Sequence, residues 1–192
     1  MDLIYIDDER FENLKYQIMP LTKGEYESCL FSGCDFSNSD LSEIRFVETE
    51  FIDCEFSNAK IVQTSFQDIT FKNCKILGLQ FPDSNEFGFN ATFKNCQLNY
   101  STFTRMKINK INFENSQLHH TDFTGAQMKS AVLKQCDLFC AIFDQTNLEK
   151  ADLRSSINYT IDPEKNRLKG ARFLLPEVAG LLKKYSIKID PF

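Results

Sequence analysis

Glycine and proline are scarce in this sequence, with 7 glycines and 5 prolines among its 192 residues. A flexible linker or a disordered tail would contain more of both. No apolar stretch approaches the roughly 20 residues needed to span a bilayer. Residues 1–8 also lack the basic and apolar segments of a secretory signal. We therefore expect one soluble, cytoplasmic domain over residues 1–192, without membrane association.

Sequence motifs that carry chemistry are absent as well. The chain contains no GxSxG, no P-loop, no dinucleotide-binding glycine pattern and no HExxH. Its 7 cysteines include no CxxC pair and no Cys/His ligand spacing. His119 and His120 are adjacent but have no third ligand in the pattern. The sequence predicts reduced thiols, no catalytic residue, no cofactor and no metal site.

What the sequence does contain is a repeat of five residues. Every fifth residue from Leu21 to Phe81 is apolar, and the pattern resumes at Phe93 and continues to Leu153. All 26 of these positions are apolar in a chain that is 42% hydrophobic, so chance cannot explain the pattern. The residue two places earlier is Ala, Ser, Thr, Cys or Gly at 20 of the 26 positions. Asn, Asp or Gly often stands two places later, as at Gly33 and Asn73.

A period of five fits neither a helix, which repeats at 3.6 residues, nor a strand, which repeats at 2. It requires a short extended segment and a corner in each repeat, with one large and one small residue pointing inward. Six cysteines occupy the small inward position, where we expect them to pack rather than react: Cys29, Cys34, Cys54, Cys74, Cys96 and Cys136. Cys140 should lie at the surface.

A longer period of twenty residues places Cys34, Cys54 and Cys74 at the same phase. The segment FKNCKI at 71–76 returns as FKNCQL at 93–98, a displacement of 22. One coil therefore has two extra residues, which fall within Pro82–Thr92. Either Phe87 or Phe89 must supply the inward residue that is missing there. The repeats together make close to seven coils.

Segments such as SGCDFSNSDL, KNCKI, ENSQL and KQCDL resemble the pentapeptide-repeat family over about residues 21–173. This resemblance implies an all-β fold, a right-handed quadrilateral β-helix with four pentapeptides to a coil. We expect the solenoid to span 21–173, with the interruption at 82–92. Residues 1–20 are predicted to form an irregular N-terminal cap. Residues 174–192 are predicted to form a short capping helix, followed by a strand at 186–189.

The C-terminal segment is similar to that of Qnr-type quinolone-resistance proteins. In that group the C-terminal helix forms a head-to-head dimer, and the resemblance implies a homodimer contact here through six side chains: Leu174, Leu175, Val178, Leu181, Leu182 and Tyr185. It also implies binding to the type II topoisomerases DNA gyrase and topoisomerase IV. The rod would act as an acidic, DNA-shaped mimic that protects the enzyme from quinolones, without contacting nucleic acid directly.

The charge distribution indicates a difference from such a mimic. Residues 1–60 carry 14 acidic and 5 basic side chains, whereas residues 61–192 carry 13 acidic and 17 basic ones. A rod paired through its C-termini would be acidic at its outer ends rather than at its middle. Two functions stay open, a topoisomerase binder and a scaffold or regulator of another protein, while an enzyme has no motif in its favour. The predicted partner contacts lie in the interruption and in the acidic half: Asp83, Glu86, Phe87, Phe89, Glu43, Glu48 and Asp53.

Overall fold

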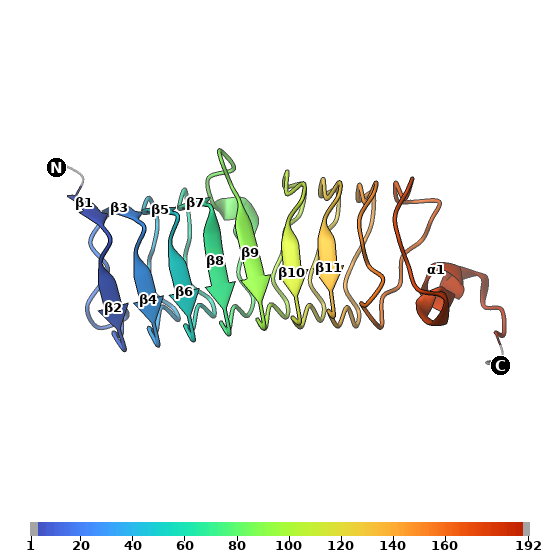
Figure 1. The fold of residues 1–192 in the computed structure, drawn as a ribbon, viewed down its shortest axis with the longest axis horizontal. Helices are drawn as coiled ribbons and strands as arrows, with labels where there is room; N and C mark the ends of the chain where they lie inside the picture. Colours follow the sequence, from blue (N-terminus) through green and yellow to red (C-terminus); the bar gives the residue numbers. More distant parts are fainter. Residues whose placement is uncertain (1–3, 190–192) are drawn as a thin grey trace.

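The computed structural model describes residues 4–189, which form a straight rod of stacked coils with a short helical segment at the C-terminal end (Figure 1). Two parallel sheets run along the rod. The first wall contains β1 (Ile4–Asp7), β3 (Gly24–Glu27), β5 (Arg45–Val47) and β7 (Ser65–Gln67). The second wall contains β2 (Arg10–Glu12), β4 (Leu30–Ser32), β6 (Glu50–Ile52), β8 (Ile69–Lys72), β9 (Ala91–Lys94), β10 (Asn112–Glu114) and β11 (Val132–Lys134).

Strand register follows the predicted twenty-residue coil. Phe31 in β4 pairs with Phe51 in β6, and Phe51 pairs with Phe71 in β8. The remaining two walls are held by single bridges with the same spacing, such as Asp35 with Glu55 and Asp40 with Lys60. Across the interruption, Phe71 pairs with Phe93, so the displacement of 22 is confirmed. The chain is a right-handed β-solenoid, as the family resemblance implied, and its predicted repeats make about seven turns. The pairing of β1 with β3 and of Asp152 with Arg172 extends the stack at both ends.

The interior is filled by side chains, because all 26 predicted inward residues are buried. Phenylalanine rings on the second wall stack from coil to coil, with centroids 4.5 Å apart for Phe11 and Phe31 and 5.0 Å apart for Phe93 and Phe113. Rings on neighbouring walls meet edge to face, as Phe51 and Phe56 do at 5.0 Å. Both geometries are favourable for aromatic pairs. Within residues 4–189, the inward positions of the coils are thus occupied by the protein's own side chains.

The small inward residues also satisfy backbone carbonyls. Thr64 Oγ1 donates to the carbonyl of Leu41 at 2.8 Å, and Thr146 Oγ1 donates to that of Phe123 at 2.8 Å. The thiol of Cys74 makes the corresponding contact with the carbonyl of Phe51 at 3.2 Å. Thr, Ser and Cys therefore suit this position because they are small and can donate a hydrogen bond within the core.

Most corners of the coil hold a residue in the left-handed region. Gly33, Asn38 and Asp53 have φ values of 63°, 52° and 55°, as expected for residues that tolerate this backbone. Lys110 and Tyr100 adopt the same conformation, with φ of 64° and 63°. The corner geometry is thus imposed by the coil even where the local residue does not favour it.

The two ends differ from the sequence-based boundaries. β1 and β2 pair in register with β3 and β4, so the regular solenoid extends to Ile4 and only the segment just after Tyr16 departs from it. At the other end, η2 (Leu175–Glu177), α1 (Ala179–Leu182) and η3 (Lys183–Tyr185) form the cap. Residues 186–189 form no strand, because Ser186 turns the chain with φ of 52° and no neighbouring strand receives them. Residues 190–192 of the predicted segment lie outside the described range.

Candidate interaction surfaces

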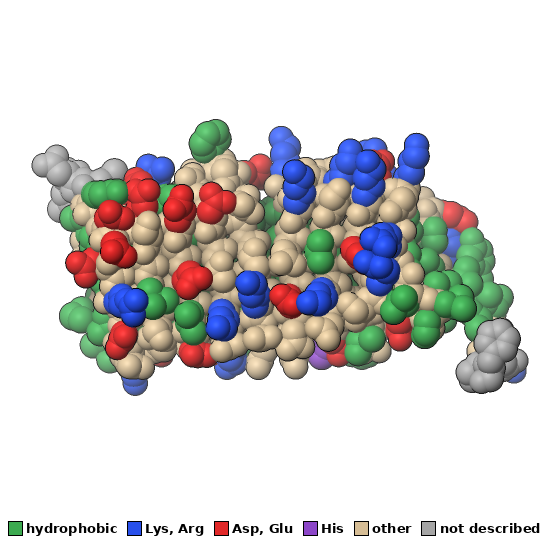
Figure 2. All heavy atoms as spheres, in the orientation of Figure 1, with side chains coloured by type: hydrophobic (Ala, Val, Ile, Leu, Met, Phe, Trp, Pro, Cys, Tyr) green, Lys and Arg blue, Asp and Glu red, His purple; other side chains and the backbone are tan. Residues whose placement is uncertain are grey.

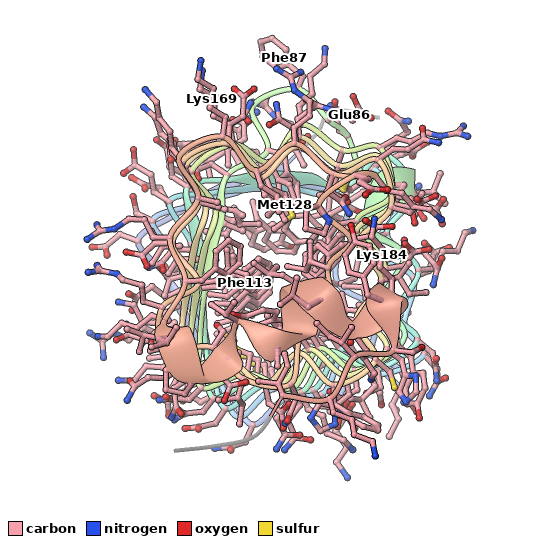
Figure 3. The ribbon with its side chains drawn as sticks, turned by 90° about the vertical axis from the view of Figure 1, so that its right-hand side faces the viewer. Glu86, Phe87, Phe113, Met128, Lys169 and Lys184 are labelled. Atoms are coloured by element: carbon pink, nitrogen blue, oxygen red, sulfur yellow. The ribbon has the colours of Figure 1, made fainter. Side chains whose placement is uncertain are left out.

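The interruption exposes one aromatic side chain and buries the other. Phe87 is 81% exposed and projects from the outer wall beside Glu86 (Figure 3). Phe89 packs against the core, with its ring centroid 5.9 Å from that of Phe81 and 6.3 Å from that of Phe66. Phe89 is therefore the inward residue that the period required. The two extra residues leave Phe87 as a protruding apolar side chain on a wall that is otherwise regular.

Backbone contacts hold the loop in place. The N–H of Phe87 donates to Asn85 Oδ1 at 3.0 Å, and Gln67 Nε2 donates to the carbonyl of Phe87 at 3.4 Å. Gly88 has φ of 72°, which allows the chain to return to the wall. η1 (Phe81–Asp83) precedes this turn, and Asp83 and Glu86 are exposed. The loop thus presents an aromatic ring and two carboxylates on a fixed backbone.

The three acidic candidates in the N-terminal half lie on three different corners. Glu43, Glu48 and Asp53 are separated by five residues each, which is one wall of the coil. Glu43 forms an ion pair with Lys23, with Nζ 2.6 Å from Oε2. Asp53 accepts a hydrogen bond from Asn73 Nδ2 at 2.9 Å, the first step of an asparagine ladder that continues to Asn95. Glu48 alone has neither contact among residues 4–189. These three residues therefore do not form one patch.

The C-terminal candidates divide into exposed and packed side chains. Leu174, Leu175 and Tyr185 are exposed, with Leu175 at 78%. Leu181 packs on the end of the solenoid core. Gly180 is needed beside it, because an added Cβ would lie 2.2 Å from the carbonyl oxygen of Tyr159. Val178 and Leu182 are partly buried. Pairing through this helix stays a prediction, with Leu174 and Leu175 as its accessible part.

The cysteines and histidines do not form a chemical centre. Six thiols are buried as predicted and Cys140 is exposed. Burial raises the pKa of the Cys136 thiol to about 12 and also raises the pKa of Cys29. Within residues 4–189 no group of three His, Cys, Asp or Glu side chains could hold a metal ion. His119 Nε2 lies 2.9 Å from Asp137 Oδ2, a pairwise contact at the surface.

The remaining surface offers shallow depressions rather than a pocket. One of them, a groove of ≈ 580 Å³, lies between the last coil and the tail, where Phe139, Tyr159, Leu182 and Ile187 line it. No helix within the described range is long and apolar enough to cross a membrane. With its interior filled and its corners regular, this molecule offers its outer walls, its loop and its ends for contact.

Comparison with known sequences identifies the family of this chain. Two family models match, one described as a pentapeptide repeat region over residues 25–86 and one described as pentapeptide repeats (8 copies) over 96–135 and 116–154. The chain belongs to the pentapeptide-repeat family. No curated protein matches the sequence significantly.

Several solved structures share the fold. A trypsin-treated form of QnrB1, a plasmid-mediated fluoroquinolone resistance protein, is 19% identical and matches over 98% of both chains with a TM-score of 0.63. HetL, involved in heterocyst differentiation regulation in the cyanobacterium Nostoc sp. strain PCC 7120, is 17% identical. It covers 88% of this chain and 87% of its own, with a TM-score of 0.66. At these identities the likeness establishes the pentapeptide-repeat solenoid and its similarity in fold to both proteins.

Proposed function

We propose that this chain is a non-enzymatic interaction rod that binds a type II topoisomerase in the cytosol. The observation that carries this proposal is the loop at the interruption, where Phe87 is 81% exposed beside Glu86 (Figure 3) and follows the exposed Asp83. An exposed aromatic ring is the kind of side chain that dominates the free energy of binding at protein interfaces. The resemblance of the C-terminal segment to Qnr-type proteins implies the same partner, and the fold is like that of QnrB1, a fluoroquinolone resistance protein.

The physical basis is complementarity with a groove that binds DNA. Such a groove is basic, and the carboxylates of the loop and of the N-terminal half would attract it over several ångströms. Glu48 and Asp83 stand on neighbouring corners of the rod, so the enzyme would contact one side of the N-terminal half. The ring of Phe87 would then enter an apolar part of the groove and slow dissociation.

A gyrase supercoiling and cleavage assay, with and without a quinolone, tests the proposal. Addition of the protein should reduce quinolone-stabilised cleavage. A matched variant replaces residues 86–90 (EFGFN) by FSN, the sequence found at 56–58, which restores a twenty-residue coil with one inward phenylalanine. This variant should keep its melting temperature and lose the protection. Protection that survives the replacement would remove the loop from the proposal.

A different protein partner is the second candidate, and the basic side chains of the C-terminal half favour it. Figure 2 shows basic side chains along the upper right edge of the rod, and a basic groove would repel them. A scaffold or regulatory partner would then contact both acidic and basic surfaces. If the intact protein leaves gyrase activity unchanged at every concentration, this candidate replaces the first. Crosslinking from position 87 in the native cytosol would identify the partner.

A further inference from the structure

One corner of the solenoid separates its charges by sign. The two residues that follow each inward residue of the first wall form a continuous line from coil to coil, which we call the charged edge. It comprises residues 7–8, 27–28, 47–48, 67–68, 109–110, 129–130, 149–150 and 169–170, with Asn90 alone in the interrupted coil, where Phe89 points inward. Backbone hydrogen bonds join successive coils along it, from Asp8 N to Glu27 O at 3.1 Å and from Lys110 N to Lys129 O at 2.9 Å.

The charged edge is acidic in its first four coils and basic in its last four. The acidic run contains five carboxylates and no cation: Asp7, Asp8, Glu27, Glu48 and Asp68. The basic run contains four lysines and one carboxylate: Lys110, Lys129, Lys150, Lys169 and Glu149. Between them, the line itself holds only the uncharged Asn90, and the exposed Glu86 of the loop lies in the same coil. Figure 2 shows acidic side chains near the upper left edge, basic side chains along the upper right edge and an apolar protrusion between them.

Elsewhere on the rod, charges in adjacent coils neutralise one another. Lys23 pairs with Glu43 at 2.6 Å, Lys60 with Asp40 at 3.1 Å, and Lys134 with Glu114 at 2.5 Å. On the charged edge, none of the four lysines and none of the five carboxylates of the acidic run forms an ion pair within residues 4–189. Like charges stacked at a coil spacing of about 4.8 Å repel one another. The acidic run therefore contains no counter-charge, and the basic run contains only Glu149, which pairs with Arg167 outside the edge.

When two copies of the charged edge lie antiparallel, the acidic run of each copy faces the basic run of the other. A two-fold axis through the coil level of Asn90 would place Asp68 opposite Lys110 of a second copy, and Glu48 opposite Lys129. The same operation places Glu27 opposite Lys150, and Asp7 and Asp8 opposite Lys169. Each contact occurs twice in such an isologous pair. Phe87, exposed in the loop of that coil, would lie near the axis of the pair.

We propose that two copies of this chain associate side by side and antiparallel along the charged edge. A nucleic acid is a less suitable occupant, because its phosphates would meet five carboxylates on the same edge. The four lysines also span only about 14 Å, three coil spacings. The proposal does not depend on a topoisomerase partner. It also differs from pairing through the C-terminal helix, which uses the end of the rod and apolar side chains.

Two complementary triple variants test this association. One reverses the basic run with Lys110→Glu, Lys129→Glu and Lys150→Glu. The other reverses the acidic run with Glu27→Lys, Glu48→Lys and Asp68→Lys. The corners accept both residue types, since Glu48 and Lys110 already have φ of 48° and 64°. A control with the same change in charge away from the edge is Lys72→Glu, Lys94→Glu and Lys183→Glu. Sedimentation equilibrium at ionic strengths of about 0.02 M and about 0.5 M measures the association.

The wild type and the control should associate at low ionic strength and dissociate at high ionic strength. Each edge variant alone should weaken the association at least about tenfold, since six opposed charge pairs become repulsive. An equimolar mixture of the two edge variants should associate as the wild type does. Leu174→Asp with Leu175→Asp should leave the salt-sensitive association intact.

A wild type that stays monomeric at low salt overturns the proposal, as does a mixture that fails to recover the association. Loss of the association in the Leu174→Asp, Leu175→Asp variant would assign it to the C-terminal end instead. Titration of the protein into a fluorescent DNA duplex at the same low ionic strength tests nucleic acid as the alternative occupant of the basic run. Binding of the duplex by a wild type that does not self-associate would identify the basic run as a nucleic-acid contact and overturn the pairing. Neither result bears on the gyrase assay.

Discussion

Phe71 and Phe93 stack with their ring centroids 5.1 Å apart and their planes 4° from parallel, although 22 residues separate them instead of twenty. The two extra residues are thus absorbed wholly on the first wall, and the ring column of the second wall continues without a break. Phe113 follows Phe93 at 5.0 Å. The column behaves as one packed unit that includes both sides of the interruption.

Removal of one ring from this column should be costly. Phe71→Ala or Phe113→Ala should lower the free energy of unfolding by about 3 to 5 kcal/mol, because the coils above and below are tied by backbone hydrogen bonds and cannot close the gap. The outward neighbour Lys72 provides the control, and Lys72→Ala should change the free energy by less than about 0.5 kcal/mol. Chemical denaturation measures both. Equal losses in the two classes would contradict the inward register.

Periodicity accounts for most of what could be predicted from the sequence. The five-residue step identified the inward residues, the corners and the buried cysteines, because each is repeated many times at one phase. It could not choose between Phe87 and Phe89, since the period itself fails between Pro82 and Thr92. There the choice depends on which ring reaches Phe81 and Phe66 once the backbone has turned at Gly88.

The sequence also contains the separation of charge along one edge, but comparing the net charge of two halves of the chain does not reveal it. Net charge over two halves of the chain mixes the four corners, so it conceals the separation of Asp68 from Lys110 along a single edge. Glu43, Glu48 and Asp53 share the acidic half of the chain, yet their five-residue spacing already places them on different corners. The strand expected at 186–189 fails for a different reason, because alternation of Ile187 and Ile189 supplies no neighbouring strand to pair with.

Thiol accessibility should reflect the coil. In the folded protein only Cys140 should react with a thiol reagent such as 5,5′-dithiobis(2-nitrobenzoate) at neutral pH, because the other six thiols are buried. Burial also raises the pKa of Cys136 to about 12, which keeps its reactive thiolate scarce. Unfolding in denaturant should release all 7 thiols. Two or more fast-reacting thiols in the native protein would contradict the inward placement of the small residues.

Acid should destabilise the solenoid through its corner carboxylates. The backbone N–H of Ser42 donates to Asp40 Oδ1 at 2.9 Å, and contacts with Ser42 lower the pKa of Asp40 from 3.8 to about 2. A carboxylate with a depressed pKa stabilises the folded state above its unfolded pKa, and this stability is lost as the pH falls from about 4 towards 2. Asp40→Asn should therefore flatten the decline of the melting temperature in that range, as measured by thermal unfolding at a series of pH values.

The C-terminal cap should depend on Leu181 rather than on its exposed neighbours. Leu181 packs on the core, so Leu181→Asp would bury a charge at the end of the solenoid and should lower the melting temperature by several degrees. Leu175→Asp, at a side chain that is 78% exposed, should not. Thermal unfolding followed by circular dichroism near 218 nm compares the two. Similar melting temperatures would show that the helix does not cap the core.

Two phenylalanines in the interruption provide the sharpest contrast. Phe89 fills the first-wall position where Phe66 would otherwise face an empty level, so Phe89→Ala should cost about 3 kcal/mol or more of unfolding free energy. Phe87→Ala removes a ring that is 81% exposed and should change that free energy by less than about 0.5 kcal/mol. Both substitutions remove the same phenyl ring, at positions only two residues apart. Their effects on the unfolded chain should therefore be similar, and the difference between the two unfolding free energies reports the folded state. Any loss of partner binding in Phe87→Ala, at unchanged stability, then reports contact by this ring. A loss of stability in Phe87→Ala that equals the loss in Phe89→Ala would place both rings in the core and remove the loop as a recognition surface.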